Sequence, residues 1–199
     1  MPVRRAIYEN DGIYSITITC ARWIKLFEIA DGYDVVYHWF DYLKSREHYI
    51  IGYVIMPNHL HALIGFKNTK KSINSIIGNG KRFMAYELIS KLRSQGNELL
   101  LEKLNSLVNE TDRSRAKQHE VFEPSFDWKE CLDSDFIEQK LNYFHNNPLQ
   151  EHWKLAVNPE DYIHSSARFY MYGNQGIYPV TNYSELEDID LTGKLNKDE

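Results

Sequence analysis

The stretch 53-YVIMPNHLHALIGF-66 is the most informative part of this 199-residue sequence. Pro57 and Asn58 interrupt a long apolar run rich in β-branched residues. Because Pro and Asn favour turns, the pattern predicts two strands joined as an antiparallel hairpin. Side chains two residues apart in a strand point to the same face of a sheet. His59 and His61 therefore share one face of the predicted hairpin.

The sequence on either side predicts further strands and helices. Residues 13–20 alternate in the manner of a strand, and residues 34–46 carry apolar side chains at helical spacing. Residues 72–92 predict a second, longer helix, in which two glycines would permit a bend. Residues 119–124 predict a short last strand that ends at Pro124. This order predicts an α+β, ferredoxin-like (split βαβ) fold, with helices on one face of an antiparallel sheet and the other face open to a ligand.

A single domain is predicted for residues 1–172, because the chain is too short for two domains with separate cores. Residues 95–118 have the character of an insertion, a short amphipathic helix followed by a polar loop. A third helix, additional to the ferredoxin-like set, is predicted from about Asp135 to Asn147. Residues 173–199 are expected to form an acidic, flexible C-terminal tail.

The charge is unevenly distributed along the chain, whose net charge is −5. Seven basic residues and one acidic residue lie between Lys67 and Arg93. This segment could bind a phosphate backbone, or it could be an ordinary solvated helix face. No apolar run approaches the roughly 20 residues of a membrane span, and no secretory signal is visible, so we expect a cytoplasmic protein. Cys20 and Cys131 follow no metal-binding spacing and are expected to be reduced thiols.

The histidine pair has two interpretations at this stage. Two imidazoles on one face can bind one divalent ion, or they can be a hydrogen-bonded pair in a polar patch. A further ligand from the third helix would favour the metal site. On that helix Tyr143 and Asn147 lie one turn apart, beside the apolar stripe of Ile137, Leu141 and Phe144. If the stripe packs on the open sheet face, Tyr143 and Asn147 lie at the helix edge nearest the histidines.

The motifs of this chain resemble those of the small single-tyrosine transposases with an HUH motif, a class that includes the REP-associated tyrosine transposases. The combination MPNHxH with YxxNNP carries the resemblance, which spans roughly residues 10–172. The matching segments are 54-VIMPNHLHALI-64, 76-IIGNGKRF-83, 141-LNYFHNNP-148 and 159-PEDYIHSSARFY-170. The inserted segment 95–118 has no counterpart in this pattern.

The resemblance implies an enzyme that cleaves and rejoins DNA. Tyr143 would be the nucleophile that attacks a phosphodiester of single-stranded DNA, giving a 5′-phosphotyrosine and a free 3′-OH, and a 3′-OH would later attack that linkage. His59, His61 and Asn147 would bind a divalent metal, Mg²⁺ or Mn²⁺, and no organic cofactor is expected. Lys140 would assist the phenol or hold a phosphate. The partners implied are single-stranded or hairpin DNA, with the protein acting as a monomer or a homodimer. Residues expected to hold the DNA backbone are Lys70, Lys71, Lys81 and Arg82.

Three other functions remain open from the sequence. A descendant of such an enzyme could bind a DNA hairpin without cleaving it. A metal-dependent phosphodiesterase would use a metal-bound water and would not need Tyr143. A replication initiator or relaxase would share the histidine motif, but the chain is too short for the helicase domain that such proteins often carry.

Overall fold

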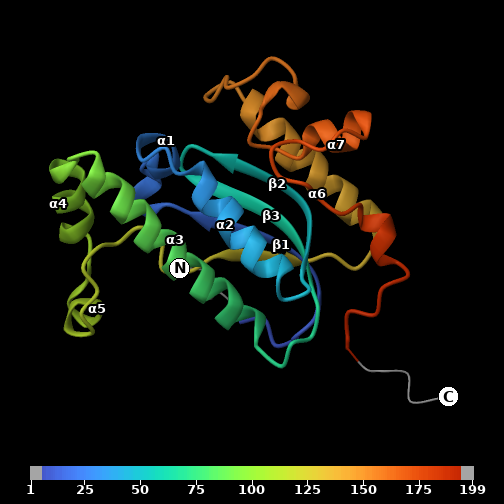
Figure 1. Ribbon diagram of the computed structural model, residues 1–199, viewed down its shortest axis with the longest axis horizontal. Coiled ribbons are helices and arrows are strands. Elements are labelled where there is room, and N and C mark those ends of the chain that lie inside the picture. Colours follow the sequence, from blue (N-terminus) through green and yellow to red (C-terminus); the bar gives the residue numbers. More distant parts are fainter. Residues whose placement is uncertain (1–5, 194–199) are drawn as a thin grey trace.

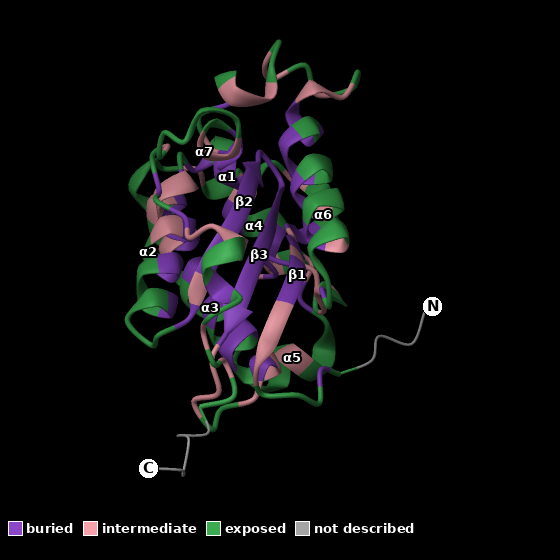
Figure 2. Cartoon of the chain, turned by 90° about the vertical axis from the view of Figure 1, so that its right-hand side faces the viewer, coloured by how far each residue is buried: buried purple, intermediate pink, exposed green. Residues whose placement is uncertain are grey.

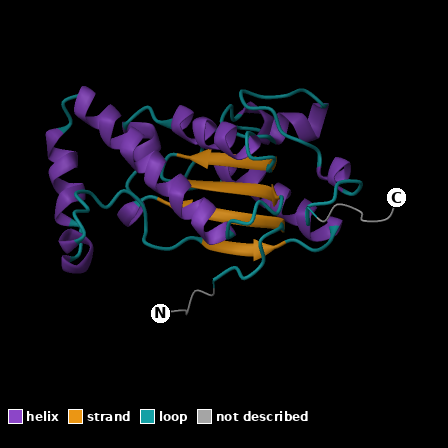
Figure 3. Ribbon diagram, turned by 60° about the horizontal axis from the view of Figure 1, so that its bottom comes forward, coloured by secondary structure: helices purple, strands orange, loops and turns teal. Residues whose placement is uncertain are grey.

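The computed structural model describes residues 6–193, which form a four-stranded antiparallel sheet with helices on both sides (Figure 1). The strand order is β2-β3-β1-β4, and Figure 3 shows the four strands side by side. This is the order of a ferredoxin-like sheet, so the predicted α+β fold class is confirmed. The strands are β1 (Gly12–Thr19), β2 (Tyr49–Met56), β3 (His59–Phe66) and β4 (Asp127–Glu130).

The predicted hairpin is the centre of the sheet. β2 and β3 pair from Met56 opposite His59, so that Pro57 and Asn58 form the turn. On its other side β3 pairs with β1, which places Thr19 opposite His59 and Thr17 opposite His61. This register puts the histidines and the two threonines on one face, because directly opposite residues in an antiparallel pair project the same way.

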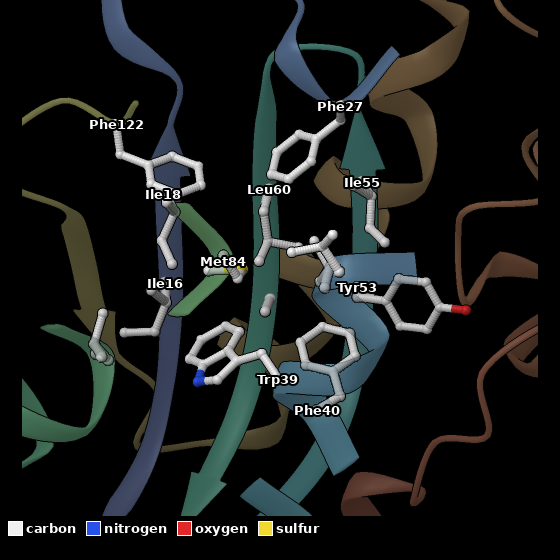
Figure 4. Packing of buried hydrophobic residues seen from close by; sticks show 14 of the residues in the cluster. Ile16, Ile18, Phe27, Trp39, Phe40, Tyr53, Ile55, Leu60, Met84 and Phe122 are labelled. Atoms are coloured by element: carbon white, nitrogen blue, oxygen red, sulfur yellow. The ribbon is translucent and has the colours of Figure 1, made fainter. Parts of the chain in front are cut away.

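The other face of the sheet packs against α2 and α3 (Figure 1). Side chains from the sheet, including Ile16, Leu60 and Tyr53, interdigitate with Trp39 of α2 and Met84 of α3 (Figure 4). The helices before and after the hairpin are α1 (Leu26–Ile29), α2 (Tyr33–Lys44), α3 (Ile73–Ser94), α4 (Glu98–Ser106) and α5 (Glu110–Ser114). The predicted helix in the inserted segment is α4, while the stretch expected to be a polar loop contains the short helix α5.

α3 continues without interruption through the two glycines at which a bend was expected. A Cβ atom on Gly80 would overlap the indole of Trp39, whereas one on Gly78 would meet no atom within 4 Å. Gly80 therefore permits the close approach of α3 to α2, and Gly78 has no such packing role.

The last strand does not lie where the sequence predicted it. Residues 119–124 contribute only an isolated bridge between Phe122 and Cys20, and β4 begins three residues after Pro124. Pro has no N–H to donate to a ladder. In addition, the Lys81 ammonium on α3 donates hydrogen bonds to the three carbonyls of residues 123–125, at 2.6, 3.3 and 3.0 Å, so these carbonyls are bonded to α3.

The third predicted helix, α6 (Ser134–Asn146), covers part of the second sheet face. Its apolar stripe of Ile137, Leu141 and Phe144 is buried against β2 and β3, which meets the condition under which Tyr143 was expected near the histidines. Figure 2 shows β2 and β3 buried along most of their length and the outer side of α6 exposed. The half of this face formed by β1 and β4 has no helix over it.

Chain segments from the C-terminal part cover the outer edge of β2. The amides of Ser166 and Thr181 donate to the carbonyls of Tyr53 and Ile50, and the amide of Ile55 donates to His164. Tyr178, Val180 and Leu186 are buried. The described part of the expected C-terminal tail, up to Gly193, thus packs on the domain and differs from the flexible tail expected, while residues 194–199 lie outside the described residues.

The remaining helical elements are the helix α7 (Ala167–Tyr172) and the 3₁₀ turns η1 (Ala21–Trp23), η2 (Asn147–Leu149), η3 (Pro159–Asp161) and η4 (Tyr183–Leu186). No helix among residues 6–193 combines the length and the apolar character that a membrane crossing requires.

Candidate active site

His59 and His61 lie side by side on the second sheet face, with ring centroids 4.8 Å apart. Only 5% and 6% of their surfaces are exposed. The Nδ1 atom of each ring is engaged: that of His59 lies 2.6 Å from Asn58 Oδ1, and that of His61 lies 2.8 Å from Thr17 Oγ1. Because the Asn58 amide nitrogen donates to the Trp23 carbonyl, the Asn58 oxygen accepts a hydrogen bond from Nδ1–H of His59, which leaves Nε2 of His59 with a lone pair.

Burial keeps both rings neutral at physiological pH. Removal from water lowers the pKa of His61 to about 3, with smaller effects from the charges of His59 and Lys140. Burial, with a smaller effect from the neighbouring His152, lowers the pKa of His59 to about 4. Nε2 of His61 is buried and has no hydrogen-bond partner. A neutral ring with one nitrogen oriented by a polar neighbour and the other available is the usual state of a metal-ligating histidine.

α6 brings Tyr143 to this pair. Asp133 caps the helix by accepting a hydrogen bond from the Phe136 amide, so α6 begins slightly before the predicted start. Phe144 stacks on His61 with ring centroids 5.1 Å apart. The ring of Tyr143 meets the His61 ring edge-on, with centroids 5.3 Å apart. Half of the Tyr143 surface is exposed. The packing of Phe144 therefore fixes α6 so that the phenol of Tyr143 stands beside the histidines and in contact with solvent.

Tyr143 and His61 line a groove of about 590 Å³ over the part of the sheet that α6 leaves uncovered. Its floor is polar, because the residues of β1 that face this way are Ser15, Thr17 and Thr19. Basic side chains at its walls are Arg22, Lys129 and Lys140. Glu123 and Asp127 also line it, so the groove combines neutral hydroxyls with three basic and two acidic side chains. It is large enough for a nucleotide-sized ligand.

Asn147, the expected third ligand, caps the C-terminus of α6 one turn beyond Tyr143. It is buried, and its backbone N–H donates to the Phe144 carbonyl. It is not among the residues that line the groove. Within residues 6–193 no cluster of three or more His, Cys, Asp or Glu side chains is arranged to hold a metal ion. A complete ligand set around the two histidines would thus need an amide, a hydroxyl or water.

The structure separates the basic residues that the sequence grouped together. Lys140 lies in the groove wall, with its ammonium 4.9 Å from the Phe136 ring. Lys81 binds the carbonyls of residues 123–125. Lys70 and Lys71 are exposed beyond the far end of β3, and the last residue of that strand lies about 23 Å from His59 at the usual rise of a strand. Arg82 is exposed on α3.

Two tryptophans beside His59 were not singled out from the sequence. The rings of Trp23 and Trp153 lie 5.8 and 6.0 Å from the His59 ring, and 61% of the Trp23 surface is exposed. Arg22 and Trp23 both have positive φ angles, 52° and 57°, which side-chain-bearing residues seldom adopt. Strained backbone of this kind tends to occur at binding sites. The sequence shows only that Trp23 follows a predicted strand, and its place beside His59 comes from the pairing of that strand with β3.

No protein-family model and no curated protein matches this sequence. Among solved structures, the chain is similar to a REP-associated tyrosine transposase bound to a REP hairpin. The TM-score is 0.59 and the identity 15%, over 90% of this chain and 89% of the other. A candidate transposase from Deinococcus radiodurans R1 is 16% identical over 73% of this chain and 97% of its own, with a TM-score of 0.42.

The first of these likenesses extends over nearly the whole of both chains. At 15% identity it concerns the path of the backbone. The chain has the α+β fold of a REP-associated tyrosine transposase.

Proposed function

We propose that this protein is a transposase-type enzyme that cleaves single-stranded DNA through Tyr143 and rejoins the strands. The observation that carries the proposal is the pairing of an exposed phenol with a buried, unpartnered imidazole nitrogen at the end of an open polar groove. In the cleavage step the Tyr143 oxygen bonds to phosphorus, the bond from phosphorus to the 3′ oxygen breaks, and that oxygen takes up a proton. The reverse attack by a 3′-OH releases Tyr143.

The phenol needs assistance, because a tyrosine hydroxyl with an ordinary pKa near 10 is a weak nucleophile at neutral pH. Lys140 lies one turn before Tyr143 and lines the same groove. Its positive charge would favour the phenolate and hold a phosphate oxygen. The covalent link to tyrosine conserves the energy of the phosphodiester bond, so that rejoining needs no nucleotide cofactor.

His59 and His61 fit the role of metal ligands, because both rings are neutral and both present Nε2. Asn147 would complete the set through its amide oxygen. A bound Mg²⁺ or Mn²⁺ would withdraw charge from the attacked phosphate and favour the ionised phenol. Thr17 and Asn58 orient the two rings, and Phe144 holds His61 in place.

The proposed substrate is a DNA hairpin with a flanking single strand. The similar solved protein is bound to a REP hairpin, and the groove of this chain is open enough to admit a strand. Arg22, Lys129 and Lys140 are placed to hold phosphates near Tyr143. Lys70, Lys71 and Arg82 would hold the DNA farther away, and Lys81 would act by fixing the backbone of residues 123–125. The protein would act as a monomer or a homodimer.

The experiment is a search for a covalent adduct. The purified protein would be incubated with Mn²⁺ or Mg²⁺ and with single-stranded hairpin oligonucleotides from the DNA flanking its own gene. We expect a protein–DNA adduct that survives SDS. It should be absent in Tyr143→Phe and His61→Ala and retained in Tyr42→Phe, which removes a partly exposed hydroxyl from α2.

The same experiment separates the alternatives. If the DNA is cleaved without an adduct, and if this cleavage persists in Tyr143→Phe, the protein is a phosphodiesterase that uses water as the nucleophile. Tight binding of a hairpin with no cleavage under any metal condition would indicate a DNA-binding protein without catalytic activity.

A further inference from the structure

A second groove, of about 740 Å³, lies between α3 and residues 115–124. One wall is the outer side of α3, where Arg82, Tyr86 and Arg93 face the groove. The opposite wall begins with Arg115, which the inserted segment contributes. The floor between the walls is apolar, formed by residues such as Ile89 and Val121.

The charge of this groove is opposite in sign to that of the whole chain. Arg82, Arg93 and Arg115 are exposed, and none of them forms an ion pair with another residue between 6 and 193. Lys117 is neutralised by Glu120 at 2.6 Å and by Asp112 at 3.3 Å. Three unneutralised guanidinium groups around one concave surface, on a protein of net charge −5, indicate an anionic ligand.

An exposed aromatic ring accompanies the arginines. Tyr86 is 65% exposed on the α3 wall of the groove. A ring of this kind contributes nothing to the core, but it offers a flat face on which a nucleobase can stack. Alternating positive charge and aromatic surface is the pattern by which proteins hold single-stranded nucleic acid.

The second groove adjoins the groove that contains Tyr143. Glu123 lines both grooves, Pro124 lines the second and Ser125 lines the first. Residues 123–125 therefore form a low ridge between them. Lys81 fixes this ridge to α3 through its bonds to all three carbonyls. A strand that leaves the Tyr143 groove over this ridge enters the second groove directly.

We propose that the second groove binds the sugar-phosphate backbone of the DNA strand that continues from the Tyr143 groove. Arg82, Arg93 and Arg115 hold phosphates, and Tyr86 stacks on a base. This inference rests on the proposed function and extends it, because it gives the inserted segment 95–118 a role in gripping the substrate beyond the site of cleavage.

The test measures DNA binding in a protein that cannot cleave. In a Tyr143→Phe background with EDTA, the affinity for labelled single-stranded oligonucleotides would be followed by fluorescence anisotropy over a range of salt concentrations. Each phosphate contact contributes about 0.7 to the slope of log K against log salt concentration for single strands. Arg93→Ala with Arg115→Ala should therefore lower the slope by about 1.4, which corresponds to an affinity about 25-fold weaker at 0.1 M salt.

The control is a matched pair of exposed arginines far from both grooves, Arg46→Ala with Arg168→Ala, which should leave the slope unchanged. An oligonucleotide of about six nucleotides is long enough for the first groove only, so the groove variant and the control should bind it with equal affinity. An oligonucleotide of about 14 nucleotides should bind the groove variant more weakly than the control. Tyr86→Ala should weaken binding of the longer strand without changing the salt slope.

Equal salt slopes in the groove variant and the control would overturn the inference, and so would an equal effect on the short and long strands. Adduct formation by the Tyr143 protein is measured separately. If the adduct forms but the arginine variants bind normally, only the second groove is refuted. If no adduct forms but the slope falls as stated, the groove is supported and the cleavage mechanism is refuted.

Discussion

Two hydrogen bonds determine what the histidine pair can bind. Asn58 and Thr17 engage Nδ1 of His59 and His61, so Nε2 is the nitrogen that each ring has available for another ligand. Thr17 also lines the floor of the Tyr143 groove, whereas Asn58 does not line it. Their effect is on the orientation and protonation of the rings, which are the properties that decide whether a divalent ion binds.

Replacement of Thr17 by Val should therefore weaken metal binding. The isosteric change removes the hydroxyl that orients His61, and losses of this kind typically lower metal affinity about 10–100-fold. Mn²⁺ binding measured by calorimetry would test the prediction. Thr19→Val is the matched control, because Thr19 lies on the same strand and face but has no bond to a histidine. Equal affinities in the two variants would refute the role of Thr17.

Trp23 should contribute to DNA binding beside the histidines. Its exposed ring lies next to His59 in the Tyr143 groove, where a base flanking the attacked phosphate can stack on it. Base stacking on an aromatic side chain contributes about 1–3 kcal/mol. In metal-free binding assays Trp23→Ala should lose affinity by that amount and Trp23→Phe should retain most of it. A loss as large in the Phe variant would point instead to a disturbed backbone.

The sequence could place the histidines but not their partners. The alternation along β3 was enough to predict that His59 and His61 share a face. The roles of Thr17 and Trp23 depend on the register between β1 and β3, which joins residues more than 35 positions apart. No local pattern encodes such a pairing, and it became visible only in the structure.

At the level of elements, the two glycines of α3 provide a matched comparison. Gly78→Ala should stabilise the protein by about 1 kcal/mol, because alanine is the better helix former and the new methyl group meets open space. Gly80→Ala gains the same propensity but forces a methyl group into the indole of Trp39, and overpacking of this kind costs about 1–3 kcal/mol. Urea unfolding should show Gly80→Ala to be less stable than Gly78→Ala by about 1–3 kcal/mol.

The contrast between α6 and β4 explains which elements sequence reasoning can locate. α6 has a regular apolar stripe over two turns, and its position was predicted to within a few residues. β4 is four residues long, DWKE, and three of the four are charged. It is a strand because β1 offers an unpaired edge and Lys81 holds the preceding backbone, neither of which is a property of its own sequence.

At the scale of the whole molecule, a buried histidine remote from the candidate site makes stability depend on pH. His48 packs against Phe66 at 5.4 Å between ring centroids, and its Nδ1 accepts a hydrogen bond from the Lys67 amide. Burial lowers its pKa to about 4. Its pKa when unfolded is near 6.5, so the unfolded chain binds the proton first as the pH falls. The effect of His48 should therefore lower the stability as the pH falls from about 6.5 to about 4. Below pH 4 this residue should cause no further loss.

The contribution of His48 to this loss is about 2 kcal/mol between pH 7 and pH 5. His48→Asn keeps an acceptor near the Lys67 amide and removes the titration. Urea unfolding at pH 7 and pH 5 would give the loss of unfolding free energy for each protein. The loss should be about 2 kcal/mol smaller in His48→Asn than in the unchanged protein. An NMR titration of the His48 ring would measure the pKa directly, and a value near 6.5 would contradict the prediction.

The cover on the outer edge of β2 has a consequence for how the chain is made. The amides and carbonyls that close this edge belong to residues 164–181, whereas the sheet itself needs only residues up to 130. A ribosome releases the hairpin long before it releases its cover. Nascent chains that have emerged only as far as α6 therefore expose an apolar sheet with an open strand edge. Such a surface recruits chaperones, and without a chaperone it can pair with a neighbouring chain.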